Sequence, residues 1–175
     1  NVVTLTENTV TEITCHARGV RHLAPDTRSV VEIGGQDSKV LRLNEEGKVF
    51  DFVMNDRCAA GTGRFLEIVC ERLGADFECL EEVVAKSENP VAINSMCVVF
   101  AETEIISLLA EGTPPEDILA GIQQSVAVRI ASLSGRRLAP PVIFTGGVAL
   151  VPGMCAALAN ALKVKVAPSS SPQFT

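Results

Sequence analysis

The chain has 175 residues, 47% of them apolar, and it contains no Trp or Tyr. Its formal net charge is −6, from 15 basic and 21 acidic side chains, which argues against nucleic acid or an anionic membrane as a partner. No apolar run reaches membrane-spanning length, and six cysteines without paired spacing are typical of a reducing compartment, so we expect a cytoplasmic globular protein.

The first expected element is a short helix over residues 10–20, followed by a turn at Pro25 and Asp26. Cys15 and His16 are neighbours in this helix. Adjacent side chains on a helix point about 100° apart, so this pair is a poor chelate. Helix packing, or contact with another lobe, is the favoured interpretation of both residues.

Three antiparallel strands are expected next, over residues 29–33, 38–43 and 48–54. The tight turn Gly-Gly-Gln-Asp at residues 34–37 joins the first two strands, and residues 44–47 turn into the third. Glycine hairpins are common in proteins that bind nothing, so this turn alone does not identify a phosphate site.

A cysteine and two glycines precede the next helix. Cys58 is followed by Gly61 and Gly63, and apolar residues at helical spacing from Phe65 mark a helix that Gly74 ends. We therefore expect Cys58 just before a helix N-terminus, where unpaired N–H groups and the helix dipole favour a thiolate. Such a thiolate is a nucleophile or a metal ligand; the alternative is an inert, buried cysteine.

A second cysteine, Cys97, lies at the expected start of a helix that stops at Gly112. Neither this cysteine nor the earlier one belongs to a Cys-x-x-Cys pair, so a single chain has no signature of a four-thiolate site. A two-fold dimer would present two copies of each cysteine, and four thiolates suit an iron–sulfur cluster or zinc. Cys70, Cys79 and Cys155 are assigned structural roles.

The remaining elements are expected to be scaffold. They are a short helix over 77–87, a long helix from about 115 to 133, a strand over 141–145, a helix over 152–162 and a strand over 164–166. Residues 113–116 (Thr-Pro-Pro-Glu) predict a capping box with proline at the first helical position. The strand that ends at Gly146 and Gly147 allows a ligand to lie against the backbone, although a lone Gly-Gly is a weak signal.

Four segments, taken together, resemble one family. They are residues 32–39 (Glu-Ile-Gly-Gly-Gln-Asp-Ser-Lys), 55–65, 97–104 and 144–149, and the match runs in order from about residue 11 to 175. The family comprises the ATPase activators of 2-hydroxyacyl-CoA dehydratases and the ATPase subunits of benzoyl-CoA reductases, the BadF/BadG/BcrA/BcrD type.

The resemblance implies an α/β fold of the actin-like ATPase superfamily. The expected unit is a ribonuclease-H-like lobe, in which helices flank a mixed sheet. Residues 1–28 are then the linking helix and tail of a first lobe, and residues 29–175 are the second lobe, truncated at its C-terminal end. By this interpretation the chain is a fragment, essentially the second lobe of a two-lobe protein.

The resemblance also implies an ATP-dependent electron-transfer activator. Its Cys58 and Cys97, from two subunits of a homodimer or a paralogous heterodimer, would hold one bridging 4Fe–4S cluster. ATP or ADP and Mg²⁺ are the other implied cofactors. The implied electron acceptor is a 2-hydroxyacyl-CoA dehydratase or a benzoyl-CoA reductase, and the implied donor is a low-potential ferredoxin or flavodoxin.

Nucleotide contacts are implied at both glycine turns: Gly34, Gly35 and Gln36 in the hairpin, and Gly146 and Gly147 after the later strand. Glycine hairpins of this kind let backbone N–H groups approach phosphate without a Cβ in the way. In actin-like ATPases the later turn is where the adenosine rests.

Two carboxylates are the implied catalytic residues, Glu32 and Asp37. Glu32 stands where the family usually has Asp, and the additional methylene moves the carboxylate by about 1 Å, a displacement that can alter a rate severely. Asp37 matches the family.

Two other functions stay open. A sugar or metabolite kinase of the same superfamily would use the glycine turns for phosphate and keep the cysteines in the core, so it predicts no iron. A non-enzymatic scaffold or metal-binding dimer is the third reading, because a fragment of this kind lacks half of the nucleotide cleft.

Overall fold

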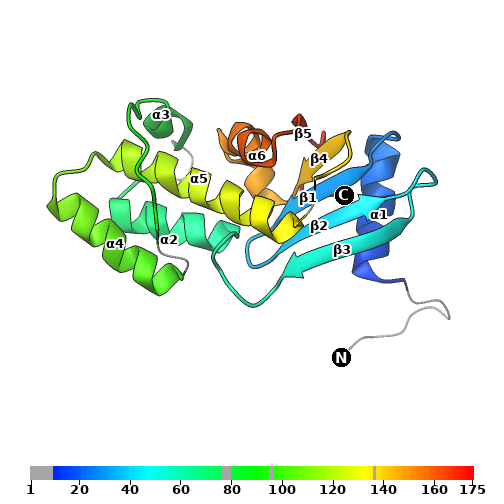
Figure 1. The fold of residues 1–175 in the computed structure, drawn as a ribbon, viewed down its shortest axis with the longest axis horizontal. Helices are drawn as coiled ribbons and strands as arrows, with labels where there is room; N and C mark the ends of the chain where they lie inside the picture. Colours follow the sequence, from blue (N-terminus) through cyan, green and yellow to red (C-terminus); the bar gives the residue numbers. More distant parts are fainter. Residues whose placement is uncertain (1–9, 76–79, 95–96, 136) are drawn as a thin grey trace.

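The computed structural model describes residues 10–75, 80–94, 97–135 and 137–175. Its centre is a five-stranded mixed sheet in the order β3-β2-β1-β4-β5 (Figure 1). The first three strands pair antiparallel, whereas β4 pairs parallel with both β1 and β5. The strands are β1 Ser29–Ile33, β2 Ser38–Leu43, β3 Val49–Asn55, β4 Val142–Thr145 and β5 Val166–Pro168.

Helices cover both faces of the sheet and continue beyond one end of it. α1 packs on one face with β2 and β3, α5 and α6 pack on the other, and α2, α3 and α4 extend the helical layer past the β1–β2 hairpin (Figure 1). The helices are α1 Glu12–Leu23, α2 Gly63–Leu73, α3 Leu80–Val84, α4 Val98–Ala110, α5 Pro115–Ser134 and α6 Met154–Leu162, and a 3-10 turn, η2, covers Gly147–Leu150.

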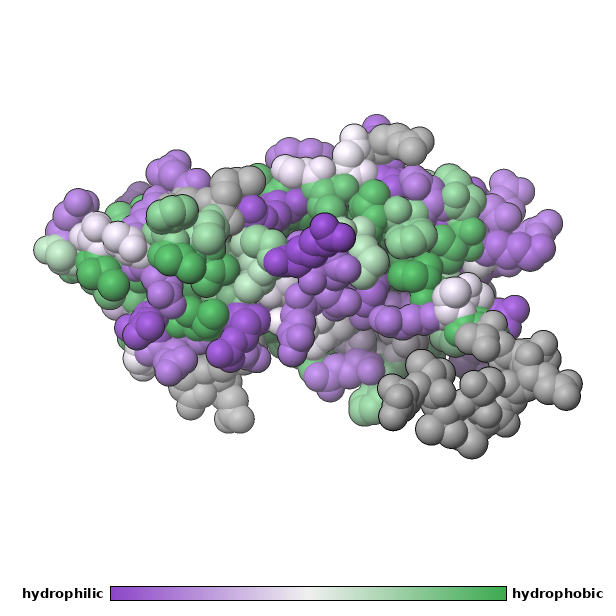
Figure 2. Space-filling model, turned by 90° about the horizontal axis from the view of Figure 1, so that it is seen from below, coloured by the Kyte–Doolittle hydropathy of each residue, from purple (hydrophilic) through white to green (hydrophobic). Residues whose placement is uncertain are grey.

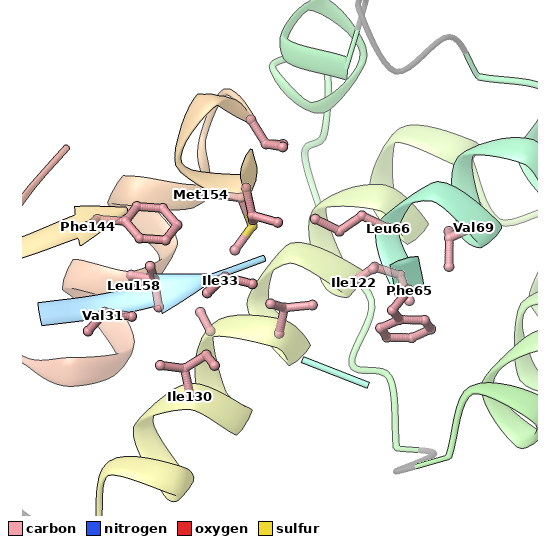
Figure 3. Close-up of a cluster of buried hydrophobic side chains, with 14 of the residues drawn as sticks. Val31, Ile33, Phe65, Leu66, Val69, Ile122, Ile130, Phe144, Met154 and Leu158 are labelled. Carbon is pink, nitrogen blue, oxygen red and sulfur yellow. The ribbon is translucent and has the colours of Figure 1, made fainter. Parts of the chain in front are cut away.

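The central strand, β1, is buried on both faces because its side chains enter two separate apolar clusters. Val30 packs toward α1, in a cluster that contains Val20 and Leu41. Val31 and Ile33 point the other way, into the larger cluster beneath α2, α5 and α6 (Figure 3). A strand held on both sides in this way gives the loops at its end a fixed place.

The expected ribonuclease-H-like lobe is confirmed, and the bounds of β1 and β2 match those expected. The capping box is wrong: Pro114, not Thr113, is the N-cap of α5, and no side chain caps this helix. Pro115 does occupy the first helical position, where the missing N–H costs nothing. The expected helix over 77–87 lies partly outside the described residues.

Candidate functional site

The hairpin between β1 and β2 is hydrogen-bonded to the first residues of α2. The backbone N–H of Gly63 donates to the carbonyl oxygen of Gly34, and that of Arg64 to the carbonyl oxygen of Gly35, both at 2.8 Å. A Cβ on Gly63 would come within 3.1–3.3 Å of Val148, Gly34 and Gly35, so only a residue without a side chain fits without adjustment. The hairpin, the start of α2 and η2 therefore meet at one place.

This contact corrects the expectation for Cys58. α2 begins at Gly63 with Thr62 as its N-cap, so Cys58 lies four residues before the cap rather than at the helix end. The first two helical N–H groups are already bonded to the hairpin. They are not free to stabilise a thiolate, because a donor paired with a carbonyl oxygen is satisfied.

The loop that carries Cys58 is shaped instead by Asn55, the last residue of β3. The side-chain amide of Asn55 donates to the carbonyl oxygens of Cys58, at 2.7 Å, and Ala60, at 3.1 Å. Its side-chain oxygen accepts from the Cys58 N–H at 3.2 Å. The Cys58 side chain is free and exposed at the surface, which contradicts the reading of an inert core cysteine.

The expectation for Cys97 is confirmed. This residue is the N-cap of α4, and its carbonyl oxygen accepts from the N–H of Ala101 at 2.9 Å. Its side chain is also free and exposed. The Cys58 loop and the start of α4 both lie along the lower edge of the molecule in Figure 1, and α2 packs on α4.

Gly146 makes the closest backbone contact at the end of β4. Its φ is +86°, in the left-handed region, and a Cβ here would collide with the backbone of Ile33. Its N–H donates to the carbonyl oxygen of Pro172 at 2.8 Å. Gly147, which begins η2, has room around it, with only the Gln173 side chain near the place of a Cβ.

In the hairpin, the N–H of Gly34 is used internally, because it donates to the carbonyl oxygen of Asp37 at 2.9 Å. Gly35 and Gln36 form the exposed tip. Of the three hairpin residues implied as nucleotide contacts, these two are therefore the ones placed to offer N–H groups to a phosphate.

Glu32 and Asp37 share a cation. The ammonium of Lys39 lies 3.1 Å from Glu32 Oε2, 2.7 Å from Asp37 Oδ2 and 2.9 Å from Glu12 Oε1. Only 3% of the Lys39 side chain is exposed. The single ammonium of Lys39 is thus shared among three carboxylates.

His16 joins the same cluster from α1. Its Nδ1 lies 2.9 Å from Glu32 Oε2, and its Nε2 lies 3.0 Å from the hydroxyl of Thr145 and 3.3 Å from that of Thr175. Glu32 and Thr145 are register partners on the parallel strands β1 and β4. The imidazole therefore spans the ends of the two strands that lead to the glycine turns.

The cluster shifts the titration of its members. Burial alone would raise the pKa of Glu32, but the interaction with His16 and the positive charge of Lys39 outweigh it and lower that pKa. Burial would likewise lower the pKa of Lys39, and its bonds to Asp37, Glu12 and Glu32 raise it instead. Glu32 and Lys39 are thus both ionised near neutral pH.

Two members of this cluster, His16 and Lys39, were missed by the sequence analysis. Lys39 lies in a strand whose other residues are buried, and a buried lysine requires a charged partner, so its position was a usable signal. His16 lies on the face of α1 that carries Ala17 and Val20, both buried. That position predicted burial but not the partner, since Thr145 is 129 residues away.

The sequence model of the BadF/BadG/BcrA/BcrD ATPase family matches residues 2–175. The chain belongs to this family. It is 44% identical over 167 residues to the 2-hydroxyisocaproyl-CoA dehydratase activator of Clostridioides difficile, covering 95% of this chain and 63% of the relative. It is 43% identical over 171 residues to the (R)-2-hydroxyglutaryl-CoA dehydratase activating ATPase of Acidaminococcus fermentans, covering 97% and 65%.

The fold agrees with a solved structure of a family member. The activator of the 2-hydroxyisocaproyl-CoA dehydratase from Clostridium difficile with bound ADPNP superposes with a TM-score of 0.91 at 42% identity, covering 98% of this chain and 64% of that one. This chain thus spans slightly under two thirds of the length of those relatives. Among the described residues, no helix is long and apolar enough to cross a membrane.

Proposed function

We propose that this chain is the second lobe of an ATP-dependent activator that delivers electrons to a 2-hydroxyacyl-CoA dehydratase or a benzoyl-CoA reductase. Residues 1–28 would be the link to the first lobe and residues 29–175 the second lobe. The observation that carries the proposal is the family match over residues 2–175, which includes two exposed cysteines on neighbouring elements. Family membership disfavours the kinase and scaffold alternatives.

The cysteines fit an iron–sulfur centre only if a second subunit takes part. Cys58 and Cys97 are both free and exposed, and one chain supplies two thiolates where a 4Fe–4S cluster takes four. Within the described ranges, no three His, Cys, Asp or Glu side chains are grouped to hold a metal ion. A homodimer or a paralogous heterodimer would provide four thiolates; such a cluster supplies one-electron transfer at low potential.

The exposed apolar residues on α4 support a subunit interface beside Cys97. Val99 and Phe100 are 67% and 68% exposed, and Ile106, two turns further along the helix, is 60% exposed. Figure 2 shows apolar surface over this end of the molecule, on the left. A helix that is apolar on its outer face as well as its inner face is typical of an element buried in an assembly.

The proposed nucleotide site lies at the two glycine turns. Gly35 and Gln36 would offer backbone N–H groups to phosphate, and Gly146 and Gly147 would let the adenosine lie against the backbone. Glu32 and Asp37 would orient the attacking water or Mg²⁺. Because Gly63 and Arg64 bond to the hairpin, a movement of the hairpin also moves α2 and the Cys58 loop ahead of it.

Anaerobic cluster reconstitution tests the proposal. We would count iron and sulfide per protomer, and measure the mass in solution, for the wild type, Cys58→Ser and Cys97→Ser. We expect about two irons per protomer on a dimer, lost in either variant. Cys15→Ser is the matched control, since Cys15 is also exposed but lies on α1.

The same protein, at full length, should hydrolyse ATP and pass electrons from a low-potential ferredoxin or flavodoxin to its dehydratase or reductase. A folded dimer that takes up no iron, or an iron content that survives both cysteine replacements, would contradict the activator function. Phosphorylation of a sugar by the full-length protein would instead support the kinase alternative.

A further inference from the structure

Lys39 is a charged residue buried within an otherwise apolar part of β2. Its neighbours on β2, Val40 and Leu41, are fully buried apolar residues. Desolvating an ammonium is costly, and buried ion pairs are often no more stabilising than apolar residues of similar volume. The three carboxylates around Lys39 therefore suggest a role other than stability.

Lys39 holds two particular carboxylates in place, those of Glu32 and Asp37. Lys39 and Glu32 are register partners on the antiparallel strands β1 and β2, so their side chains leave the same face of the sheet side by side. Asp37 lies in the turn two residues before Lys39, and its carboxylate makes the shortest of the three contacts, at 2.7 Å. An ammonium has three N–H donors, and each can serve one carboxylate.

His16 contacts the same carboxylate oxygen of Glu32, Oε2, that Lys39 reaches. It reaches Glu32 from α1 at 2.9 Å and Thr145 from the same ring at 3.0 Å. The side chain of Glu32 is 17% exposed, so it is largely enclosed by its two cationic or hydrogen-bonding neighbours while still reaching the surface. Such second contacts are what hold a reactive group to within a fraction of an ångström.

We propose that Lys39 and His16 are positioning residues for ATP hydrolysis, and that they hold the carboxylates of Glu32 and Asp37 beside the phosphates of the bound nucleotide. This inference rests on the nucleotide site proposed above. The same contacts explain how a glutamate can be held in place at position 32. A glutamate side chain has one more rotatable bond than aspartate, and the contacts from His16 on α1 and Lys39 on β2 restrict that additional freedom.

The test is steady-state ATP hydrolysis by the full-length protein, with binding of a fluorescent ADP analogue measured separately. Displacement of a catalytic group by about 1 Å can cost about 100-fold in rate. We therefore expect Lys39→Met and His16→Ala to lower kcat by about 10- to 100-fold, while KM for ATP and Kd for the ADP analogue change less than about 3-fold. Lys39→Arg, which keeps the charge, should recover part of kcat.

Arg42→Met separates positioning from a general loss of stability. Arg42 is on the same strand, is 7% exposed and pairs with Asp51 at 3.0 Å, but it lies at the far end of β2 from the hairpin. This variant should lose stability and keep kcat. If the wild type hydrolyses ATP and folded Lys39→Met and His16→Ala match its kcat, the positioning roles are wrong. If the wild type itself has no ATPase activity, the proposed function fails first.

Discussion

The side chain of Asn55 makes two hydrogen bonds to the backbone of Cys58. Its amide nitrogen donates to the Cys58 carbonyl oxygen at 2.7 Å, and its side-chain oxygen accepts from the Cys58 N–H at 3.2 Å. A third bond ties the same side chain to Ala60. One asparagine at the end of a strand thus sets the shape of the loop that presents the exposed thiol.

The first prediction concerns that asparagine. Asn55→Ala removes all three side-chain bonds and should lower the free energy of unfolding by about 1–3 kcal/mol. In the reconstituted protein it should also speed the loss of iron to a chelator several-fold, because the thiolate is held less firmly. Asn44→Ala is the control: Asn44 caps another turn by accepting from the N–H of Lys48 at 2.8 Å. Equal iron loss in the two variants would count against the role of Asn55.

The second prediction compares two glycines with the same backbone conformation. Gly146 has φ +86° and Gly112 has φ +83°, but a Cβ on Gly146 would meet the backbone of Ile33, whereas one on Gly112 would meet nothing within 4 Å. Gly112→Ala should cost only the left-handed strain, about 1–2 kcal/mol. Gly146→Ala should cost about 1–3 kcal/mol more, through overlap. Urea unfolding measures both, and equal losses would show that the contact with β1 is not tight.

The third prediction is a pH dependence at Asp117. Hydrogen bonds from the hydroxyl of Ser87, at 2.7 Å, and from the N–H of Asn89, at 3.0 Å, lower the pKa of Asp117 below its usual 3.8. A folded pKa below the unfolded one means that the stabilisation is complete above about pH 4 and is lost as the pH falls through the folded pKa.

Asp117→Asn should therefore destabilise the protein at pH 7 and flatten the loss of stability below about pH 4, as followed by urea unfolding at a series of pH values. Asp26→Asn, at an exposed turn, is the control. An unchanged slope in Asp117→Asn would mean that other carboxylates produce the acid sensitivity.

The fourth prediction concerns cysteine reactivity. Burial raises the pKa of the Cys70 thiol to about 11, whereas Cys58 and Cys97 are exposed. The thiolate is the reactive form, so iodoacetamide at pH 8 should modify Cys58 and Cys97 in the folded chain and leave Cys70 unmodified. Peptide mass spectrometry before and after adding urea measures this, and Cys70 should react only in urea. Rapid modification of Cys70 without denaturant would show that the core opens there.

The fifth prediction concerns the apolar face of α4. Val99→Asp should weaken dimerisation of the reconstituted protein by more than about 10-fold, because a charge would be buried in the proposed interface. Val128→Asp is the matched control, since Val128 is a similarly exposed valine, at 58%, on α5. Sedimentation velocity gives the dimer dissociation constant. Equal effects of the two variants would place the interface elsewhere.

The elements that follow a simple period were predictable. β1 and β2 were bounded to the residue because tight turns and apolar strand residues mark them, and Cys97 was placed correctly because it precedes a long helical pattern. The start of α2 could not be predicted in this way, because the N–H groups of Gly63 and Arg64 are hydrogen-bonded to a hairpin almost 30 residues earlier in the chain. No local pattern reports such a contact.

The polar cluster shows the same limit more clearly. Glu32 and Asp37 were selected by resemblance, but their partners come from α1 and β2. His16 was interpreted as packing because a helical pattern predicts which face is buried and not what that face meets. Its contact with Thr145 exists only because β1 and β4 are adjacent in the sheet.

That adjacency also sets an order of assembly. The hairpin, the Cys58 loop and α2 lie within residues 29–73, whereas the bond between His16 and Thr145 closes a span of 129 residues. On the ribosome the first group can form while most of the chain is still unmade, but the second must wait for β4. A nascent or prematurely terminated chain would therefore present its cysteine loop, with the Cys58 thiol exposed as it is in the complete fold, before the contact between α1 and β4 has formed.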